Sequence, residues 1–261
     1  MFEVCTIASG SSGNCLVMTD GVTHILVDAG ISARRICKAL RELGIDPADL
    51  AGILVTHEHS DHVSGLTTLL KQLPIPVYAT RATGRQLCYR IPAMELYLHD
   101  FEPGDSFQLG AMGVETFPTP HDAAGSTGYA LRCGCRKAAV VTDLGEVTAA
   151  VLDGIQGADL LVCEANHDVE TLCSGGYPYY LKQRILGDHG HLSNEAGGAL
   201  ARHAAEHGAK KILLAHLSQE NNTPAMAYSA VHRALSAAGI GDDDVLLEVA
   251  PRADLGRRYE V

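Results

Sequence analysis

The sequence predicts an α/β fold of four layers, an αββα sandwich in which two mixed sheets pack face to face and helices cover both outer surfaces. Length and composition allow it, because 261 residues with 46% apolar and 20% charged side chains can bury a large core. Short apolar runs alternate with amphipathic stretches before residue 80 and after residue 140, whereas strand-like runs follow one another from about 91 to 142. A doubly wound parallel sheet would not contain that succession of strands. No linker or internal repeat divides the chain, so we expect a single domain over residues 1–261.

The individual elements follow from periodicity and from end signals. Short runs rich in apolar and β-branched residues are typical of buried strands. These runs lie at residues 2–8, 15–19, 24–29, 51–56, 75–79, 107–110, 112–119, 127–133, 137–143, 158–165, 210–216 and 244–250. Longer amphipathic stretches predict helices, the first of them with Ser32 as its cap and Gly44 as its stop. They lie at residues 32–43, 64–73, 80–90, 146–155, 193–207 and 223–238.

Charge and composition narrow the function classes. The formal net charge is −11, from 20 Lys and Arg against 31 Asp and Glu, which argues against a broad electrostatic grip on nucleic acid but allows a local basic rim. No apolar run reaches the ~18 residues of a membrane span, and the first residues lack the basic and apolar regions of a secretion signal. We therefore expect a cytoplasmic protein without a membrane partner. The eight cysteines lie mostly in apolar runs, as reduced core residues do.

A dense group of metal-binding residue types follows the predicted strand at 51–56. The segment Thr56-His57-Glu58-His59-Ser60-Asp61-His62 contains three imidazoles and an aspartate within six residues, at the end of a buried strand. Imidazole is the commonest metal ligand in proteins, and a simple polar turn rarely collects so many donors. The sequence therefore predicts a metal site at this strand end.

The spacing His57-x-His59-x-Asp61-His62 resembles the signature of the metallo-β-lactamase fold, and the resemblance extends over residues 1 to about 220. The other pieces of that fold are present in the expected order, each directly after an apolar strand. They are Asp28 in HILVDAG, His121 in TPHDA, Asp143 in VVTDLG and His216 in LLAHLS. The resemblance implies two divalent metal ions and a carboxylate that orients the histidine loop. One ion would bind His57, His59 and His121, the other Asp61, His62 and His216, with Asp143 between them and Asp28 as the orienting carboxylate.

Two later segments resemble motifs of the nucleic-acid phosphodiesterases of this fold, including the tRNA 3′-processing endonucleases. They are Cys163-Glu164-Ala165-Asn166-His167-Asp168 and Gly190-His191-Leu192-Ser193-Asn194-Glu195-Ala196. This resemblance implies that Glu164 holds His191, which stabilises the phosphate or protonates the leaving oxygen. The catalytic candidates are therefore Asp61, Glu164 and His191. Ser193 can equally be a helix N-cap, and we expect the ring of His167 to face solvent.

Five segments together resemble a narrower group, the YycJ/WalJ-like proteins, which are described as 5′-to-3′ DNA exonucleases. They are ASGSSGNC at 8–15, EANHD at 164–168, GGYP at 175–178, GHLSN at 190–194 and HLSQENNTP at 216–224. A loop of Ser, Gly and Asn offers backbone N–H groups and an amide to a terminal phosphate or a nucleotide edge. The substrate-binding candidates in these segments are Ser11, Ser12, Asn14, Ser193 and Asn194.

The sequence thus predicts a metal-dependent phosphodiesterase, most simply a 5′-to-3′ exonuclease that acts on DNA ends with two metal ions and a bridging hydroxide. Zinc and manganese both suit a site of imidazoles and carboxylates. A thioesterase or lactonase on the same fold is the alternative, and a non-catalytic binding domain is a third hypothesis that the complete ligand set disfavours. Basic side chains at the groove edge would hold the strand. The candidates are Arg132, Arg136, Lys137, Lys182, Arg184 and Arg252.

Overall fold

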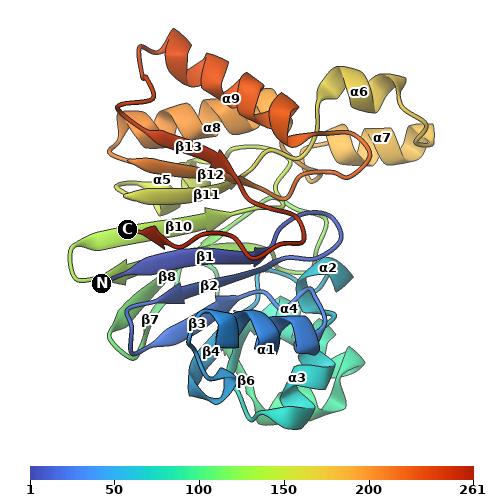
Figure 1. The fold of residues 1–261 in the computed structure, drawn as a ribbon. Coiled ribbons are helices and arrows are strands. Elements are labelled where there is room, and N and C mark those ends of the chain that lie inside the picture. The colour runs from blue at the N-terminus through green and yellow to red at the C-terminus, as the bar shows by residue number, and fades with distance from the viewer.

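Two seven-stranded sheets pack face to face in the computed structural model, which describes residues 1–261 (Figure 1). In spatial order the first sheet contains β14 (Tyr259–Glu260), β1 (Glu3–Ala8), β2 (Cys15–Thr19), β3 (His24–Val27), β4 (Leu50–Leu54), β5 (Val77–Thr80) and β6 (Leu98–Phe101). The second contains β13 (Leu246–Val249), β12 (Lys211–Ala215), β11 (Leu160–Glu164), β10 (Arg136–Val141), β9 (Thr127–Cys133), β8 (Met112–Pro118) and β7 (Ser106–Leu109). Strands β3 to β6 and β10 to β13 are parallel and the other neighbours are antiparallel, so both sheets are mixed, as predicted.

Helices cover the outer face of each sheet (Figure 1). Those on the first sheet are α1 (Ala33–Glu42), α3 (Leu66–Gln72), α4 (Arg81–Arg90) and the 3-10 turn η2 (Pro92–Leu96). Those on the second sheet are α5 (Ala149–Ile155), α8 (Asn194–Glu206) and α9 (Pro224–Ala237). The remaining elements are the 3-10 turn η1 (Pro47–Asp49), the short α2 (Ser60–Val63), and the pair α6 (Val169–Ser174) and α7 (Tyr179–Leu186), which extends from one edge of the sandwich. The predicted four-layer architecture is confirmed.

Three apolar cores separate the four layers. Strands covered on both faces bury every side chain, and successive side chains point to opposite cores. In β2, Cys15 and Val17 belong to the core beneath α1 and α3, whereas Leu16 and Met18 belong to the core between the sheets. The second sheet alternates in the same way between the central core and the core beneath α8 and α9. This double burial explains why the strands appear in the sequence as nearly continuous apolar runs.

Some elements depart from the prediction. β6 and β14 were not expected, because β6 is a short edge strand with two polar residues and β14 has only two residues. α6 and α7 were not expected either, since α7 buries none of its side chains and shows no apolar stripe toward the core. The helix predicted at 64–73 begins at Leu66 and is preceded by the separate α2. No helix combines the length and apolar character that a membrane crossing requires.

The carboxyl ends of several strands meet at one edge of the sandwich. β10, β11 and β12 are parallel, and β8 runs in the same direction because β8 and β10 are both antiparallel to β9. In the first sheet, β3 and β4 are parallel and end together. The segments that follow these strands, including α2 after β4, carry every predicted metal ligand, so residues far apart in sequence come together at this edge.

Candidate metal centre

The backbone adopts a left-handed conformation at three polar residues that directly follow strands. Asp28 after β3, Asp143 after β10 and His216 after β12 have φ angles of 61°, 59° and 57°, and no other non-glycine residue has a positive φ. A left-handed conformation costs an L-residue on the order of 1 kcal/mol or more, and such residues cluster at functional sites. At these three positions the chain leaves its strand abruptly, and the side chain stays at the edge of the sheet.

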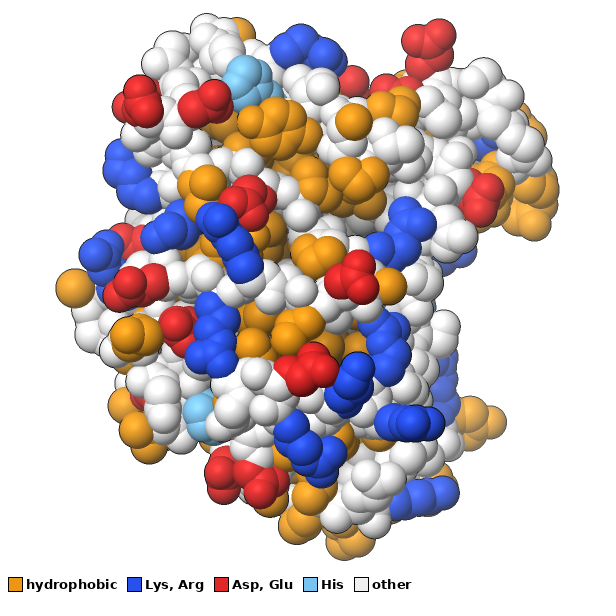
Figure 2. Space-filling view, viewed as in Figure 1, with side chains coloured by type: hydrophobic (Ala, Val, Ile, Leu, Met, Phe, Trp, Pro, Cys, Tyr) orange, Lys and Arg blue, Asp and Glu red, His pale blue; other side chains and the backbone are white.

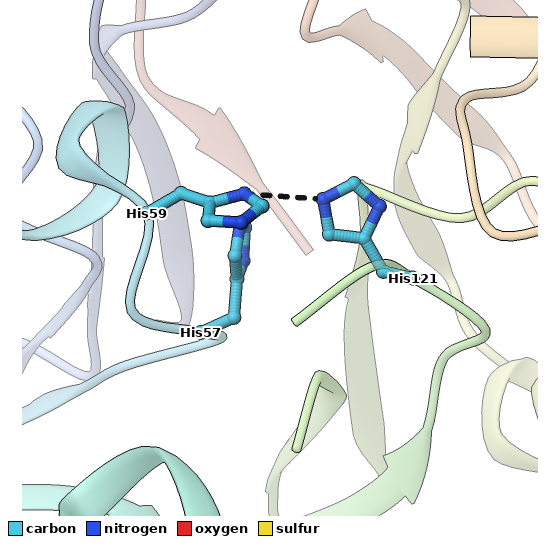
Figure 3. Close-up of side chains that lie close together, drawn as sticks. All are labelled: His57, His59 and His121. Atoms are coloured by element: carbon cyan, nitrogen blue, oxygen red, sulfur yellow. Dashed lines mark hydrogen bonds between the residues drawn. The ribbon is translucent and has the colours of Figure 1, made fainter. Parts of the chain in front are cut away.

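His57, His59 and His121 form one group of potential ligands. Each offers a ring nitrogen, and these nitrogens lie within 4.8 Å of one another. Figure 3 shows His57 and His59 on one loop facing His121 on another, with His59 Nδ1 3.3 Å from His121 Nε2. The Nε2 atom of His57 is buried and has no hydrogen-bond partner. Because buried polar atoms are nearly always hydrogen-bonded, this unpartnered nitrogen fits a metal ligand.

Asp61, His62 and His216 form a second group, also within 4.8 Å. Asp61 Oδ2 lies 3.5 Å from His62 Nε2 and 3.4 Å from His216 Nε2. Asp143 lies between the groups, with its carboxylate oxygens 3.3 Å from His62 Nε2 and 3.8 Å from His121 Nε2. Asp143 Oδ2 is buried without a hydrogen-bond partner. A carboxylate with ligand nitrogens of both groups around it is suited to bridge two cations.

Four of the five candidate ligand histidines are buried, and a neighbouring group holds the Nδ1 atom of each. Such contacts fix the orientation of a ligating imidazole and leave its Nε2 atom for the metal. The contacts are His57 Nδ1 with Thr56 Oγ1 at 3.1 Å, His62 Nδ1 with Asp28 Oδ2 at 2.7 Å, His121 Nδ1 with the carbonyl of Gly190 at 3.1 Å, and His216 Nδ1 with Glu164 Oε1 at 2.8 Å. Asp28 also accepts the backbone N–H of Thr56 at 2.8 Å, so it contacts both His62 and the start of the histidine loop.

Electrostatics favour cation binding. Burial lowers the pKa of His57 well below its usual value, so this ring is neutral. Burial also opposes a charge on His216, but Asp143 and hydrogen bonds to Asp61 and Glu164 outweigh it and raise the pKa to about 10. Burial opposes ionisation of Asp143, yet the surrounding imidazoles hold the pKa of its carboxyl well below the usual range. A bound cation would interact with an ionised carboxylate and take the place of the proton on His216.

Glu164, at the end of β11, joins His191 to the centre. Its Oε1 atom accepts from His191 Nδ1 at 2.9 Å and from His216 Nδ1 at 2.8 Å, and Oε2 accepts the N–H of Leu192 at 2.9 Å. Burial opposes ionisation of Glu164, but His191 and His216 outweigh it and lower the pKa to about 2. The expected contact between Glu164 and His191 is present. The contact with His216 is new, and no sequence pattern pointed to it.

In the loop of serine and asparagine residues near the start of the chain, one predicted substrate-binding residue lines the site, one is exposed and one supports the metal-binding loop. Ser11 lines a cavity of about 220 Å³ beside the metal centre, whereas Ser12 is exposed and does not line it. Asn14 is buried, its backbone N–H donates to the Asp61 carbonyl at 2.7 Å, and its amide lies 3.1 Å from His62 Nε2. Asn14 thus has structural contacts at the metal-binding loop, and its contact with substrate stays a prediction.

The candidates at the start of α8 also have structural contacts. Ser193 accepts a hydrogen bond from the N–H of Ala196 and caps α8. Asn194 is fully buried, and its side-chain amide pairs with that of Asn222 at 3.1 and 2.8 Å. Asn194 was predicted to bind substrate, but in this structure its amide is paired inside the protein.

His167 does not face solvent as expected. Its relative exposure is 1%, and neither ring nitrogen has a hydrogen-bond partner. Burial lowers the pKa of the ring to about 4, so the imidazole is neutral. The His167 carbonyl accepts the N–H of Asn194 at 2.8 Å, which ties the loop after β11 to the start of α8.

Three of the six basic residues predicted to hold the nucleic-acid strand lie at the end of the sandwich opposite the metal centre. They are Arg132, Arg136 and Lys137. These residues belong to the β9–β10 hairpin, whereas Asp143 follows the other end of β10. They form ion pairs with Glu115 or Asp159 there. Arg184 does line the cavity, and its guanidinium pairs with Asp122.

The three hydrophobic residues that line the cavity had no role predicted from the sequence. They are Tyr177, Leu181 and Ile185, which lie on α7 and the segment before it. The GGYP segment marked a resemblance but suggested no role for its tyrosine, and α7 itself was not predicted. Other residues lining the same cavity are His59, Asp61, Asp143, His191 and His216.

Comparisons with known proteins agree with this geometry. The family described as "Beta-lactamase superfamily domain" matches residues 23–217. Exodeoxyribonuclease WalJ of Streptococcus pneumoniae serotype 2 is 37% identical over 255 residues, which are 96% of this chain and 95% of that protein. Exodeoxyribonuclease YycJ of Bacillus anthracis is 39% identical over 238 residues, 90% of this chain and 89% of that protein.

A solved structure extends the comparison to the whole fold. The metallo-beta-lactamase fold protein YhfI from Bacillus subtilis superposes with a TM-score of 0.73 over 100% of this chain and 99% of that chain, at 17% identity. At that identity the likeness shows the fold alone. The fold and the two groups of ligands together imply divalent metal ions. The chain belongs to the beta-lactamase superfamily and, within it, to the family of the exodeoxyribonucleases WalJ and YycJ.

Proposed function

We propose that this protein is a metal-dependent phosphodiesterase that removes nucleotides from the 5′ ends of DNA, with two zinc or manganese ions. The observation that carries the proposal is the pair of ligand groups that share Asp143, with the Glu164 and His191 pair 2.9 Å apart beside them. Relatives 37% and 39% identical over most of the chain are named exodeoxyribonucleases, which supports DNA as the substrate.

The protein's own groups would divide the work between metal binding and proton transfer. Two bound ions would supply Lewis-acid activation of water and of the phosphoryl group. His57, His59 and His121 would hold one ion, and Asp61, His62 and His216 the other, with Asp143 shared. His191 lines the cavity and its Nδ1 atom is engaged by Glu164, which leaves Nε2 to donate a proton to the leaving oxygen.

The net negative charge of the chain is not spread evenly over its surface. Figure 2 shows Lys and Arg side chains gathered over the part of this face where α1 lies. The exposed basic residues of α1 are Arg34, Arg35, Lys38 and Arg41. α1 begins close to the loop that holds Asp28, so phosphates beyond the cleaved bond can follow this helix away from the metal centre. Few phosphates are neutralised in this arrangement, and recognition should concentrate at the strand end.

The test uses metal-loaded protein and five labelled substrates of matched concentration. They are linear duplex DNA with a 5′ phosphate, the same duplex with a 5′ hydroxyl, closed circular DNA, RNA of the same sequence, and a simple thioester. We expect mononucleotides from the linear duplex, a faster rate with the 5′ phosphate than without it, and no cleavage of the circle. His59→Ala should abolish this activity, whereas His99→Ala, which changes an exposed histidine on β6, should not.

Two results would contradict the proposal. Cleavage of circular DNA at the rate of linear DNA would exclude an end-directed enzyme. Turnover of the thioester without cleavage of any nucleic acid would reassign the same metal centre to a small-molecule hydrolase.

A further inference from the structure

Helix α7 contacts the metal centre's cavity although it contributes nothing to the apolar cores. None of its eight residues is buried. Figure 2 shows hydrophobic side chains at the edge of the molecule where α6 and α7 extend. Tyr179 and Tyr180 at the start of α7 are 77% and 73% exposed. Core packing does not explain the position of a helix that buries no residue. The apolar side chains that this helix turns toward the cavity therefore need another explanation.

The apolar part of the cavity wall comes entirely from this segment. Of the 14 residues that line the cavity, the three hydrophobic ones are Tyr177, Leu181 and Ile185. They are spaced four residues apart, so they lie on one side of α7 and its preceding turn. The rest of the lining is polar and includes the proposed metal ligands Asp61 and Asp143. The cavity therefore has a charged side at the metal centre and an apolar side on α7.

Polar contacts at the cavity edge fix the position of α7. The guanidinium of Arg184 pairs with Asp122, which follows the proposed metal ligand His121. The N–H of His191 donates to the carbonyl of Ile185 at 3.0 Å. A Cβ atom on Gly190 would lie 2.2 Å from that carbonyl, so only glycine allows this approach. The apolar side of α7 is thus held against the residues proposed to carry out the reaction.

We infer that Tyr177, Leu181 and Ile185 form the binding site for the base of the nucleotide that is released. This inference rests on the proposed function, since it requires a nucleotide at the metal centre. With the scissile phosphate at the metals, the base of the terminal nucleotide lies against the apolar wall. The cavity volume of about 220 Å³ is below the roughly 300 Å³ at which pockets for drug-sized ligands begin, so it has room for one base and not for a run of nucleotides. Aromatic stacking accepts every base, as an exonuclease without sequence preference requires.

The experiment compares Tyr177→Ala with wild type on two duplexes. One carries a natural 5′-terminal nucleotide and the other an abasic one, and both carry the 5′ phosphate. Wild type should cleave the natural terminus about 5- to 150-fold more efficiently in kcat/KM, the range that one stacked base supplies. Tyr177→Ala should lose most of that advantage on the natural terminus and cleave the abasic terminus at the wild-type rate. Tyr177→Phe should restore the preference.

Tyr180→Ala is the matched control, because it removes the same type of side chain three residues further along the chain, outside the cavity. It should leave both rates unchanged, and metal content should be unchanged in all variants. An equal loss on both duplexes in Tyr177→Ala would assign this tyrosine a structural role and overturn the inference. A wild type indifferent to the terminal base would also overturn it while leaving the proposed function intact. No cleavage of either duplex by metal-loaded wild type would instead refute the proposed function.

Discussion

Replacement of Glu164 by glutamine tests how His191, the proposed proton donor, is joined to the candidate metal centre. The carboxylate is fully buried, and its Oε1 atom receives both His191 Nδ1 and His216 Nδ1, while Oε2 receives the N–H groups of Leu192 and Leu144. The two backbone donors require an oxygen at the Oε2 position. The amide nitrogen of the substituted side chain would therefore face the two imidazoles, which then must accept at Nδ1 and carry their proton on Nε2. A protonated Nε2 on His216 cannot bind a metal.

The magnitude follows from these two losses. Disruption of a group that orients a metal-binding histidine costs about 10- to 100-fold in metal affinity, or roughly 1.4 to 2.7 kcal/mol. Displacement of a general acid costs about 10²- to 10⁴-fold in turnover. Glu164→Gln should show both effects. His191→Ala leaves the 2.8 Å contact between Glu164 and His216 in place, so it should show the turnover loss with unchanged metal affinity.

Two measurements separate these effects. Metal affinity is obtained by competition with a chromophoric chelator at fixed pH, and kcat is measured on 5′-phosphorylated duplex DNA at saturating metal. Wild-type metal affinity in Glu164→Gln would refute the prediction that this substitution places the His216 proton on Nε2. A weakened affinity in His191→Ala, equal to that of Glu164→Gln, would show that the two histidines do not have separate roles. Additive turnover losses in the double variant would contradict the pairing of Glu164 with His191.

Three further outcomes follow from the structure. Asp143→Ala should lose metal and hydrolysis together, because it removes the anion between the two ligand groups; metal analysis that still finds two full equivalents would exclude a bridging role. Chelation of the metal should lower the free energy of unfolding by about 3 kcal/mol for each bound ion relative to protein in free metal at 100 times Kd, because the ligands come from segments of both sheets and are together only in the folded chain; denaturant titrations with and without chelator measure it. Ile36→Ala in the fully buried face of α1 should destabilise the fold by about 2–5 kcal/mol in the same titrations and leave metal content unchanged, whereas a loss of metal would show that the α1 core and the metal centre are coupled.

The strands were predictable because a strand that is buried on both faces appears in the sequence as a nearly continuous apolar run. The run at 158–165 contains almost only apolar residues, and β11 within it is buried throughout. β6 lacks such a run, since His99 and Asp100 are exposed on an edge strand. α7 lacks one as well, because its position depends on contacts with Asp122 and the His191 loop that only the folded chain provides.

The site was predictable where side-chain chemistry is unusual and unpredictable where the residues are ordinary. Three imidazoles around Asp61 have few structural explanations, and the fold brings them to one edge with Asp143. Asn194 and its neighbours carried no such distinction, because an asparagine can bind a ligand or bond to another amide with equal ease. The partner of Asn194 is Asn222, 28 positions away, and local sequence holds no information on that pairing.

The left-handed residues at the metal centre have a consequence for protein engineering. Glycine would relieve the backbone at Asp28, Asp143 and His216, yet it would remove the side chain that each position presents. Selection for thermostability in metal-free buffer should therefore favour substitutions that abolish metal binding at these positions, since strained functional residues oppose stability and no bound ion offsets the strain. Libraries built to stabilise this scaffold should keep these three positions fixed, or a melting-temperature screen without metal will enrich inactive variants.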